Sequence, residues 1–343
     1  MISFLSLKAR LFMTASAPSQ PATAEVALLA EQVMRAVAPR IVGQRETLRQ
    51  LLLGVLCGGH CLLEGVPGVA KTLMVKSLAE ALGLSFGRIQ FTPDLMPTDI
   101  TGTDVLEENP ADGSRHTRFL PGPLFAEVLL ADEINRSPPK TQSALLEAMQ
   151  EGHVTVGGKR HLLPTPFVTL ATQNPIEQEG TYPLPEGQRD RFLVMIDVGY
   201  PSREEELEVV RRTTSEPLPP IAAVASRDAL QAAMRIVRAV PVAEHVLAAC
   251  VDLVRQSRPG DPAAPSWLPR LVRWGCGPRA SQSLAMAAKA AAAMDGRPAA
   301  ELGDVRRLAA AVLRHRLVLS YEAEAEGITA DLVVERLLET ENV

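Results

Sequence analysis

The feature that most constrains this chain is a glycine-bordered loop that ends in a lysine and a threonine. The loop, Gly65-Val66-Pro67-Gly68-Val69-Ala70-Lys71-Thr72, follows the apolar stretch Cys61-Leu62-Leu63 and precedes an apolar helical pattern. A strand, a loop and a helix in this order are typical of a phosphate-binding loop. Backbone N–H groups and the positive end of the helix dipole attract phosphate there, and Lys71 adds a full positive charge. The sequence therefore predicts nucleotide contacts from Gly65, Pro67, Gly68, Val69, Ala70, Lys71 and Thr72.

Two positions of this loop carry more specific expectations. Thr72 offers a hydroxyl beside the phosphates, where it can bind Mg²⁺. Ala70 stands where the usual pattern G-x-x-x-x-G-K-[ST] has its second glycine. Because a positive φ would strain an alanine, we predict a right-handed backbone conformation at Ala70.

A second apolar run ends in two carboxylates. The residues of 128–131 are all apolar, and Asp132 and Glu133 follow them. Such a run is typical of a strand buried on both faces of a parallel sheet, and ligands of these sheets bind at the carboxyl ends of the strands. We predict that Asp132 binds Mg²⁺ through water and that Glu133 polarises the attacking water. Asn174 ends another such run and can orient water or a γ-phosphate, although an asparagine there is more often a turn residue.

The first part of the chain alternates strand and helix patterns, which predicts an α/β fold with a parallel five-stranded sheet. Strands are expected at about 60–64, 85–92, 128–133, 167–172 and 192–198. The segments 101–121 and 153–163 each have strand-like residues on both sides of a turn, so we predict two inserted β-hairpins. A disordered surface loop is the alternative for 101–121.

The remainder of the chain divides into two segments of different character. Residues 201–343 show helical patterns and no strand pattern, which predicts an all-α domain after an α/β core at 25–200. Pro217, Pro219 and Pro220 are expected in a linker. Residues 1–24 are predicted to be disordered because 14–24 are rich in Ala, Pro, Ser and Thr, and we expect translation to begin at Met13.

Composition restricts the function classes. The 343 residues carry a formal net charge of −5, so no global basic field indicates nucleic-acid binding. The four cysteines form no disulfide framework and favour a reduced, cytoplasmic setting. No apolar run approaches the roughly 18 residues of a membrane span.

Two arginines stand out by their positions. Arg191 lies just before the last strand of the sheet, at the edge of the α/β domain, where a surface salt bridge is the simpler interpretation. Arg279 opens an alanine-rich helix at 280–294, where its charge opposes the helix dipole. A nearby phosphate would explain Arg279, and a solvated arginine is the alternative.

Taken together, these residues resemble the MoxR family of AAA+ ATPases. The resemblance spans about residues 25–343 and is carried by GVPGVAKT (65–72), LLADEINRSPPKTQSALLEAMQE (129–151), ATQNPIEQEGTYPLPE (171–186), DRF (190–192) and WGCGPRASQ (274–282). It implies a AAA+ P-loop NTPase core with inserted β-hairpins, followed by an all-α lid domain. An alanine at position 70 is usual in this family.

The resemblance also implies roles for single residues. The loop would be the Walker A motif, and Asp132 and Glu133 would be the Walker B acids. Asn174 looks like sensor 1. Arg191 looks like the arginine finger that acts on a neighbour's ATP, and Arg279 looks like sensor 2, acting either on its own nucleotide or on a neighbour's.

The family resemblance assigns a role to one further segment and assigns none to another. Val42, Gly43 and Gln44 correspond to the segment that borders the adenine in this family. Residues 259–274, which include Trp267 and Trp274, receive no role from the resemblance.

The implied activity is Mg²⁺-dependent ATP hydrolysis by a hexameric ring. The family couples it to chaperone-like remodelling or maturation of a protein complex, including metal-cofactor insertion, with a partner that carries a von Willebrand factor A (VWA) domain. A nucleic-acid-dependent AAA+ motor is one alternative, disfavoured by the acidic balance. A nucleotide-binding scaffold with negligible turnover is another, disfavoured by the presence of Glu133, Asn174 and Arg191.

Overall fold

A parallel sheet forms the centre of the α/β part. The computed structural model describes residues 20–108, 114–174, 180–214 and 220–340. Five strands lie in the order β2-β5-β8-β1-β9, which confirms the predicted sheet. Their bounds are β1 Cys61–Gly65, β2 Phe86–Gln90, β5 Val128–Asp132, β8 Val168–Gln173 and β9 Val194–Val198. Because β1 lies between β8 and β9, the loop that follows it opens at the carboxyl edge between these two strands.

The sheet separates two apolar cores. Successive side chains of a strand point to opposite faces, so Leu63 and Leu130 join one core while Leu62 and Leu129 join the other. Residues of α1 (Gln20–Val37), α2 (Arg45–Cys57) and α3 (Lys71–Ala81) belong to the first core. Residues of α5 (Pro139–Glu151) belong to the second. Burial on both faces explains why the strand sequences are continuously apolar.

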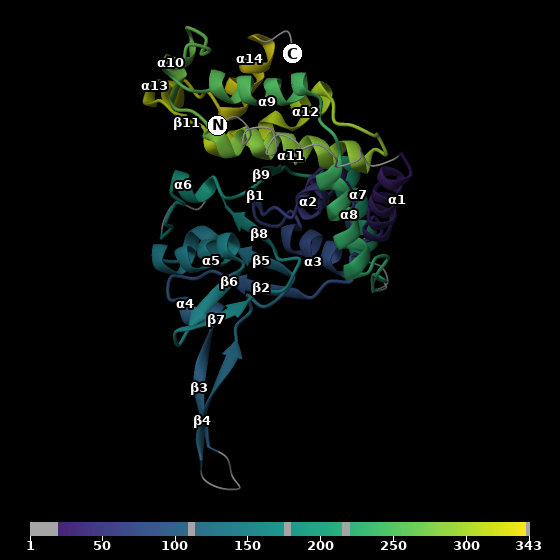
Figure 1. Ribbon diagram of the computed structural model, residues 1–343, viewed down its shortest axis with the longest axis vertical. Helices are drawn as coiled ribbons and strands as arrows, with labels where there is room; N and C mark the ends of the chain where they lie inside the picture. Colours follow the sequence, from purple (N-terminus) through teal and green to yellow (C-terminus); the bar gives the residue numbers. More distant parts are fainter. Residues whose placement is uncertain (1–19, 109–113, 175–179, 215–219, 341–343) are drawn as a thin grey trace, which may run out of the picture.

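Both predicted hairpins are present. One consists of β3 (Gly102–Glu108) and β4 (Arg115–Pro121), and residues 109–113 between them lie outside the described residues. The other consists of β6 (His153–Val156) and β7 (Lys159–Leu162). The long hairpin projects from the end of the molecule opposite the C-terminal helices (Figure 1). The rings of Phe119 and His161 stack at 3.8 Å between centroids and so join the two hairpins.

The C-terminal part is mostly helical, as predicted, but it also contains two short strands. Its helices are α7 (Arg203–Thr213), α8 (Arg227–Ala239), α9 (Glu244–Gln256), α10 (Leu268–Leu271), α11 (Pro278–Met294), α12 (Leu302–Leu313), α13 (Tyr321–Ala325) and α14 (Ala330–Thr340). The prediction that it contains no strand was wrong, because β10 (Val272–Trp274) and β11 (Val318–Leu319) pair antiparallel. Strands of two or three residues are too short to produce a period-2 pattern.

The segment without a predicted role, 259–274, contains α10 and β10. The guanidinium of Arg336 lies 4.4 Å from the ring centroid of Trp267, a cation–π contact that fastens α14 to this segment. Trp274 is exposed. The segment therefore contributes to the packing of the helical part through Trp267.

The first helix begins earlier than the sequence predicts. It starts at Gln20, so residues 20–24, expected to be disordered, are helical. Thr23 is fully buried and donates a hydrogen bond to the carbonyl of Gly296, 3.2 Å away. This contact joins segments that are remote in sequence, and composition alone could not reveal it. Residues 1–19, with Met13, and the linker residues Pro217 and Pro219 lie outside the described residues.

The helical part shares an apolar core with the α/β part. Leu53 of α2 and Leu284 of α11 belong to the same buried cluster, so the domain boundary at residue 200 stays a prediction. Among the described helices, none has both the length and the apolar character needed to cross a membrane.

A buried histidine gives the fold a pH dependence. The ring of His315, in η2 (Arg314–Arg316), donates from Nε2 to the carbonyl of Phe192 at 3.2 Å. Burial, and then the charge of Arg316, hold the pKa of His315 well below its ordinary value of 6.5. The unfolded chain takes up this proton near pH 6.5, whereas the folded chain resists it. Folding is therefore fully supported above that pH and is weakened below it.

We expect the free energy of unfolding to fall by up to about 1.4 kcal/mol per pH unit below pH 6.5 through this residue. Urea unfolding between pH 7.5 and 4.5 measures the slope, with His315→Gln as the comparison because glutamine keeps a donor but does not titrate. The variant should show the shallower curve. Parallel curves for the two proteins would contradict the assignment.

Candidate active site

The predicted phosphate loop connects β1 to α3 at the carboxyl edge of the sheet. The ammonium of Lys71 donates a hydrogen bond to the carbonyl of Gly65, at the other end of the loop. Burial lowers the pKa of Lys71, and Asp132, Glu133 and Glu64 act in the opposite direction. A Cβ at Gly65 would come within 2.5 Å of the Val198 carbonyl, so the close approach of β1 and β9 requires glycine here.

The prediction of a right-handed backbone at Ala70 was wrong. Its φ is 61° and its ψ is 25°, in the left-handed region, where it forms the N-cap of α3. The turn from loop into helix requires this conformation whatever the side chain. This conformation costs alanine about 1–2 kcal/mol of conformational free energy, because its Cβ approaches the following carbonyl oxygen.

Backbone strain gathers at the predicted site. Among the described residues, the non-glycine residues with positive φ are Gln44, Ala70 and Glu133. All three were candidate site residues on sequence grounds. Such strain concentrates where a structure fixes side chains for binding or catalysis, so it supports a common site at this edge of the sheet.

Asp132 lies directly against the loop. Its Oδ2 accepts a hydrogen bond from the hydroxyl of Thr72 at 3.3 Å, and its Oδ1 accepts one from the hydroxyl of Thr172 at 2.7 Å. The carboxylate is largely buried. A hydroxyl and a carboxylate are hard oxygen donors of the kind that Mg²⁺ binds beside nucleotide phosphates, so Thr72 and Asp132 fit that ion.

Glu133 is held by side chains that the sequence analysis did not identify. Its Oε2 accepts hydrogen bonds from Gln90 Nε2 at 2.7 Å and Arg136 Nη1 at 3.0 Å. Its backbone N–H donates to Thr172 Oγ1 at 2.9 Å. Gln90 pairs in register with Asp132 across β2 and β5, and this polar end of β2 is the signal that could have identified it.

Asn174 follows the end of β8 and is buried beside the same edge. The preceding residue, Gln173, donates to Glu64 Oε1 of β1 at 2.8 Å. The structure therefore brings the carboxyl ends of β1, β2, β5 and β8 together around the loop.

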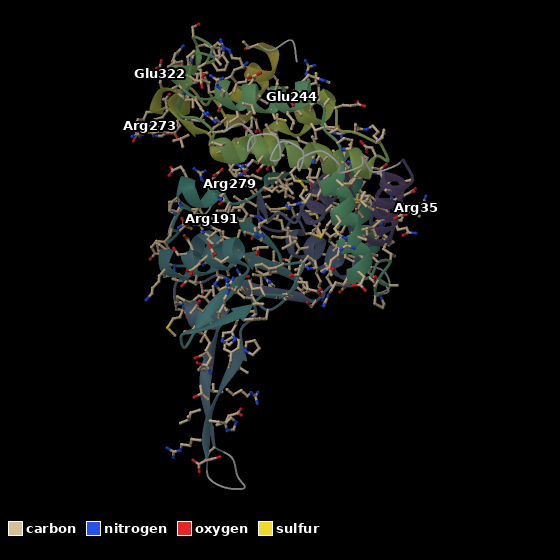
Figure 2. The ribbon with its side chains drawn as sticks, in the orientation of Figure 1. Arg35, Arg191, Glu244, Arg273, Arg279 and Glu322 are labelled. Atoms are coloured by element: carbon tan, nitrogen blue, oxygen red, sulfur yellow. The ribbon has the colours of Figure 1, made fainter. Side chains whose placement is uncertain are left out.

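The two candidate arginines come from the start of α11 and from the segment that precedes β9 (Figure 2). Arg279 Nη1 lies 3.8 Å from Asp190 Oδ2, and Asp190 directly precedes Arg191. The guanidinium of Arg191 has no hydrogen-bond or ion-pair partner within the described parts of the chain, and it lines a surface depression with Glu147 and Glu151.

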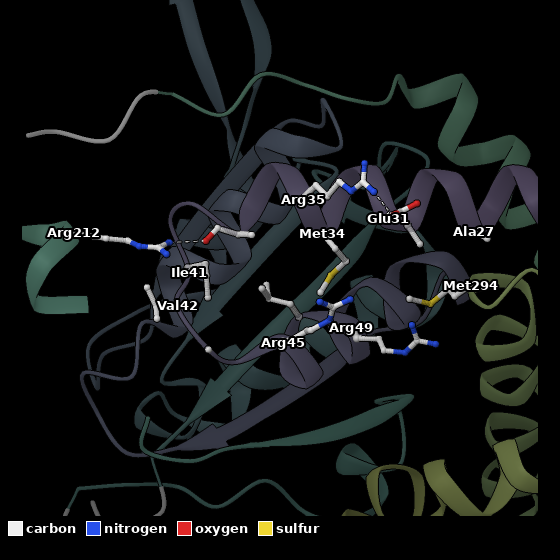
Figure 3. Close-up of a pocket in the computed structure, with 14 residues that line it drawn as sticks. Ala27, Glu31, Met34, Arg35, Ile41, Val42, Arg45, Arg49, Arg212 and Met294 are labelled. Carbon is white, nitrogen blue, oxygen red and sulfur yellow. Dashed lines mark hydrogen bonds and ion pairs between the residues drawn. The ribbon is translucent and has the colours of Figure 1, made fainter. Parts of the chain in front are cut away.

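The segment at 42–44 borders a separate cavity. Gln44 Nε2 donates to the carbonyl of Gly199, just beyond β9, at 2.9 Å. Val42 and Gly43 line a cavity of about 540 Å³ between α1, α2 and the end of α7 (Figure 3). No residue of the phosphate loop lines this cavity, so the structure connects the segment to the loop edge through Gln44 and β9.

Comparisons with known proteins agree with this architecture. Residues 60–194 match the ATPase family associated with various cellular activities (AAA), and residues 270–337 match the AAA lid domain. The chain is 46% identical over 301 residues to "Chaperone MoxR1" of Mycobacterium tuberculosis, covering 88% of this chain and 78% of that protein. It is 33% identical to "Protein MoxR" of Paracoccus denitrificans over 85% of this chain and 90% of that protein.

The fold of this chain is also similar to that of a solved structure. A protein of Cytophaga hutchinsonii to which ATPase activity is attributed superposes with a TM-score of 0.86 at 40% identity. The match covers 94% of this chain and 97% of that one. The relatives are matched along most of their length and include both the AAA core and its lid, so the chain belongs to the MoxR family of AAA+ ATPases.

Proposed function

We propose that this ATPase uses Mg²⁺-dependent ATP hydrolysis, within a ring of its own copies, to remodel a protein partner in the cytoplasm. The observation that carries the catalytic part is the contact of Thr72 with Asp132, which joins the phosphate loop to the buried acid at the sheet edge. Thr72 and Asp132 would hold Mg²⁺, which supplies charge neutralisation at the phosphates when bound.

The side chains of the site divide the remaining tasks. Lys71 binds the phosphates as a cation whose burial strengthens its electrostatic effect. Glu133 orients and polarises the attacking water once its carboxylate leaves Gln90 and Arg136. Asn174 orients the water or the γ-phosphate from the end of β8, and Gln44 positions the segment beside the adenine.

Arg191 and Arg279 support assembly of the ring. Arg279 lies 3.8 Å from Asp190, the residue before Arg191, and the guanidinium of Arg191 lacks a partner within the described residues. An arginine finger is needed where charge develops on the transferred phosphoryl group. We infer that Arg191 acts on the nucleotide of a neighbouring copy, which makes a single copy catalytically incomplete, and that Arg279 acts on its own nucleotide or on a neighbour's. AAA+ ATPases are typically oligomeric, and a hexamer is the form we propose.

The proposed partner is a protein. The relative named as a chaperone supports remodelling of protein complexes, and metal-cofactor insertion by way of a VWA-domain partner is the specific form that we propose. The two hairpins carry exposed apolar side chains, Leu106 and Leu120 on one and Leu162 on the other, which suit contact with an unfolded or partly assembled chain.

A trapped complex tests this function. Glu133→Gln keeps the size of the side chain but removes the base, so the variant should bind Mg·ATP, stall before hydrolysis and retain its partner. We expect mass spectrometry of a pull-down from native lysate to identify a VWA-domain protein or an immature metalloenzyme. Lys71→Ala is the matched control, because it should lose nucleotide affinity and retain neither. Recovery of nucleic acid with repair proteins would favour the motor function instead.

A further inference from the structure

Arg88 forms an ion pair with the oxygen of Asp132 that faces the phosphate loop. Arg88, on β2, donates to Asp132 Oδ2 from Nη2 at 2.7 Å and from Nε at 3.2 Å. The same oxygen accepts the hydroxyl of Thr72. Oδ1 is engaged by Thr172 on the side of β8. Oδ2 is therefore the oxygen that lies toward the loop and toward any ion bound there.

We propose that Arg88 is a built-in competitor of Mg²⁺, which must leave Asp132 Oδ2 before the metal can use that carboxylate. The proposal rests on the magnesium site proposed above. Asp132 is largely buried, and without Arg88 or a metal its only nearby cation among the described residues would be Lys71, which acts on it without an ion-pair contact. A buried carboxylate without a counter-charge is costly, so the two cations alternate instead of acting together.

The exposure of Arg88 fits this exchange. The side chain of Arg88 is 49% exposed whereas that of Asp132 is 12% exposed, so the arginine can swing into solvent while the acid stays in place. Arg316, by contrast, is 1% exposed in its side chain and is enclosed by its acceptors.

Release of Arg88 also affects the hydrogen bonds that restrain Glu133. Arg88 Nη2 donates to Gln90 Oε1 at 2.8 Å, and Gln90 Nε2 donates to Glu133 Oε2 at 2.7 Å. The amide of Gln90 is thus oriented at one end by Arg88, and at the other it restrains the catalytic carboxylate. When Arg88 leaves, this orientation is lost. Loading of the metal and freeing of Glu133 are therefore coupled through β2, which makes Arg88 a positioning residue.

Nucleotide binding as a function of free Mg²⁺ tests the proposal without measuring turnover. A fluorescent ADP analogue is titrated with wild-type protein, Arg88→Met and Arg88→Lys, first in EDTA and then at increasing free Mg²⁺. We expect unchanged affinity in EDTA for Arg88→Met and a midpoint for the Mg²⁺ effect about 10-fold lower than in wild type, equivalent to about 1.4 kcal/mol. Arg88→Lys, which keeps the charge with fewer contacts, should lie between them.

Arg118→Met is the matched control, because Arg118 is an exposed arginine that pairs with Glu107 on the long hairpin, and its replacement should leave the Mg²⁺ midpoint unchanged. An unchanged or higher midpoint in Arg88→Met would overturn the proposal. Weaker binding in EDTA with an unchanged midpoint would also overturn it, because Arg88 would then bind phosphate directly. A wild-type protein whose ADP affinity ignores Mg²⁺ would instead remove the magnesium site itself.

Discussion

Replacement of Arg191 with alanine is expected to lower the rate of ATP hydrolysis by about 10³-fold or more, with nucleotide binding retained. The guanidinium lies on the segment before β9 and lacks a partner within the described residues, so its removal disturbs no hydrogen bond that the structure shows. Its charge is needed only while the phosphoryl group is transferred. Single-turnover hydrolysis and equilibrium binding of a fluorescent ATP analogue separate the two effects.

A mixing experiment tests whether Arg191 acts on a neighbour. Arg191→Ala keeps an intact loop, and Lys71→Ala keeps an intact Arg191, so each variant alone should be inactive while a mixture regains part of the activity. The exposed Arg203, on the first turn of α7, provides a control, and Arg203→Ala should hydrolyse ATP like wild type. Wild-type turnover in Arg191→Ala would remove the finger assignment. A mixture that stays inactive would contradict action between copies.

Replacement of Arg316 with methionine is expected to destabilise the protein by about 3–5 kcal/mol. Arg316 is buried in the helical part and donates to the carboxylate of Asp190 at 2.8 Å, to the carbonyls of Phe192 at 2.6 Å and Leu193 at 3.2 Å, and to Ser283 Oγ at 3.1 Å. Methionine fills a similar volume but satisfies none of these acceptors. The half-buried carboxylate of Asp190 and several neutral oxygens would each lose a donor.

Urea unfolding measures this loss, and Arg306→Met is the matched control. Arg306 lies on α12, is exposed and forms no side-chain hydrogen bond or ion pair with another described residue, so its replacement should change the free energy of unfolding by less than about 0.5 kcal/mol. Because Arg316 fixes the backbone on both sides of Arg191, Arg316→Met should also slow hydrolysis in the folded fraction. A loss of stability below about 1 kcal/mol would show that these acceptors find other donors.

Much of the α/β architecture could be predicted from local sequence. The strands around Leu62, Leu129 and Leu170 are continuously apolar because both faces of the sheet are covered, and this pattern survives in a single sequence. The loop at 65–72 and the acids at 132–133 are recognisable because phosphate and magnesium demand specific residue types at fixed spacing. The turn at Gly157-Gly158 likewise predicted the short hairpin.

Other features were decided by contacts between segments remote in sequence. The left-handed backbone of Ala70 follows from the path between β1 and α3, which overrides the preference of the residue. The pairing of β10 with β11 depends on the packing of the helices around it, since neither strand has a pattern of its own.

The partners of the acids and of the arginines were likewise invisible in the linear sequence. Arg88 meets Asp132 only because β2 and β5 are neighbours in register, and Arg279 meets Asp190 only because η2 and α11 fold back onto the segment before β9. Which chemical groups the site contains can be seen in the amino-acid sequence, because phosphate chemistry restricts the residue types. Which of these groups contact one another depends on the folded chain, because those contacts arise from the order of the strands and the packing of the helices.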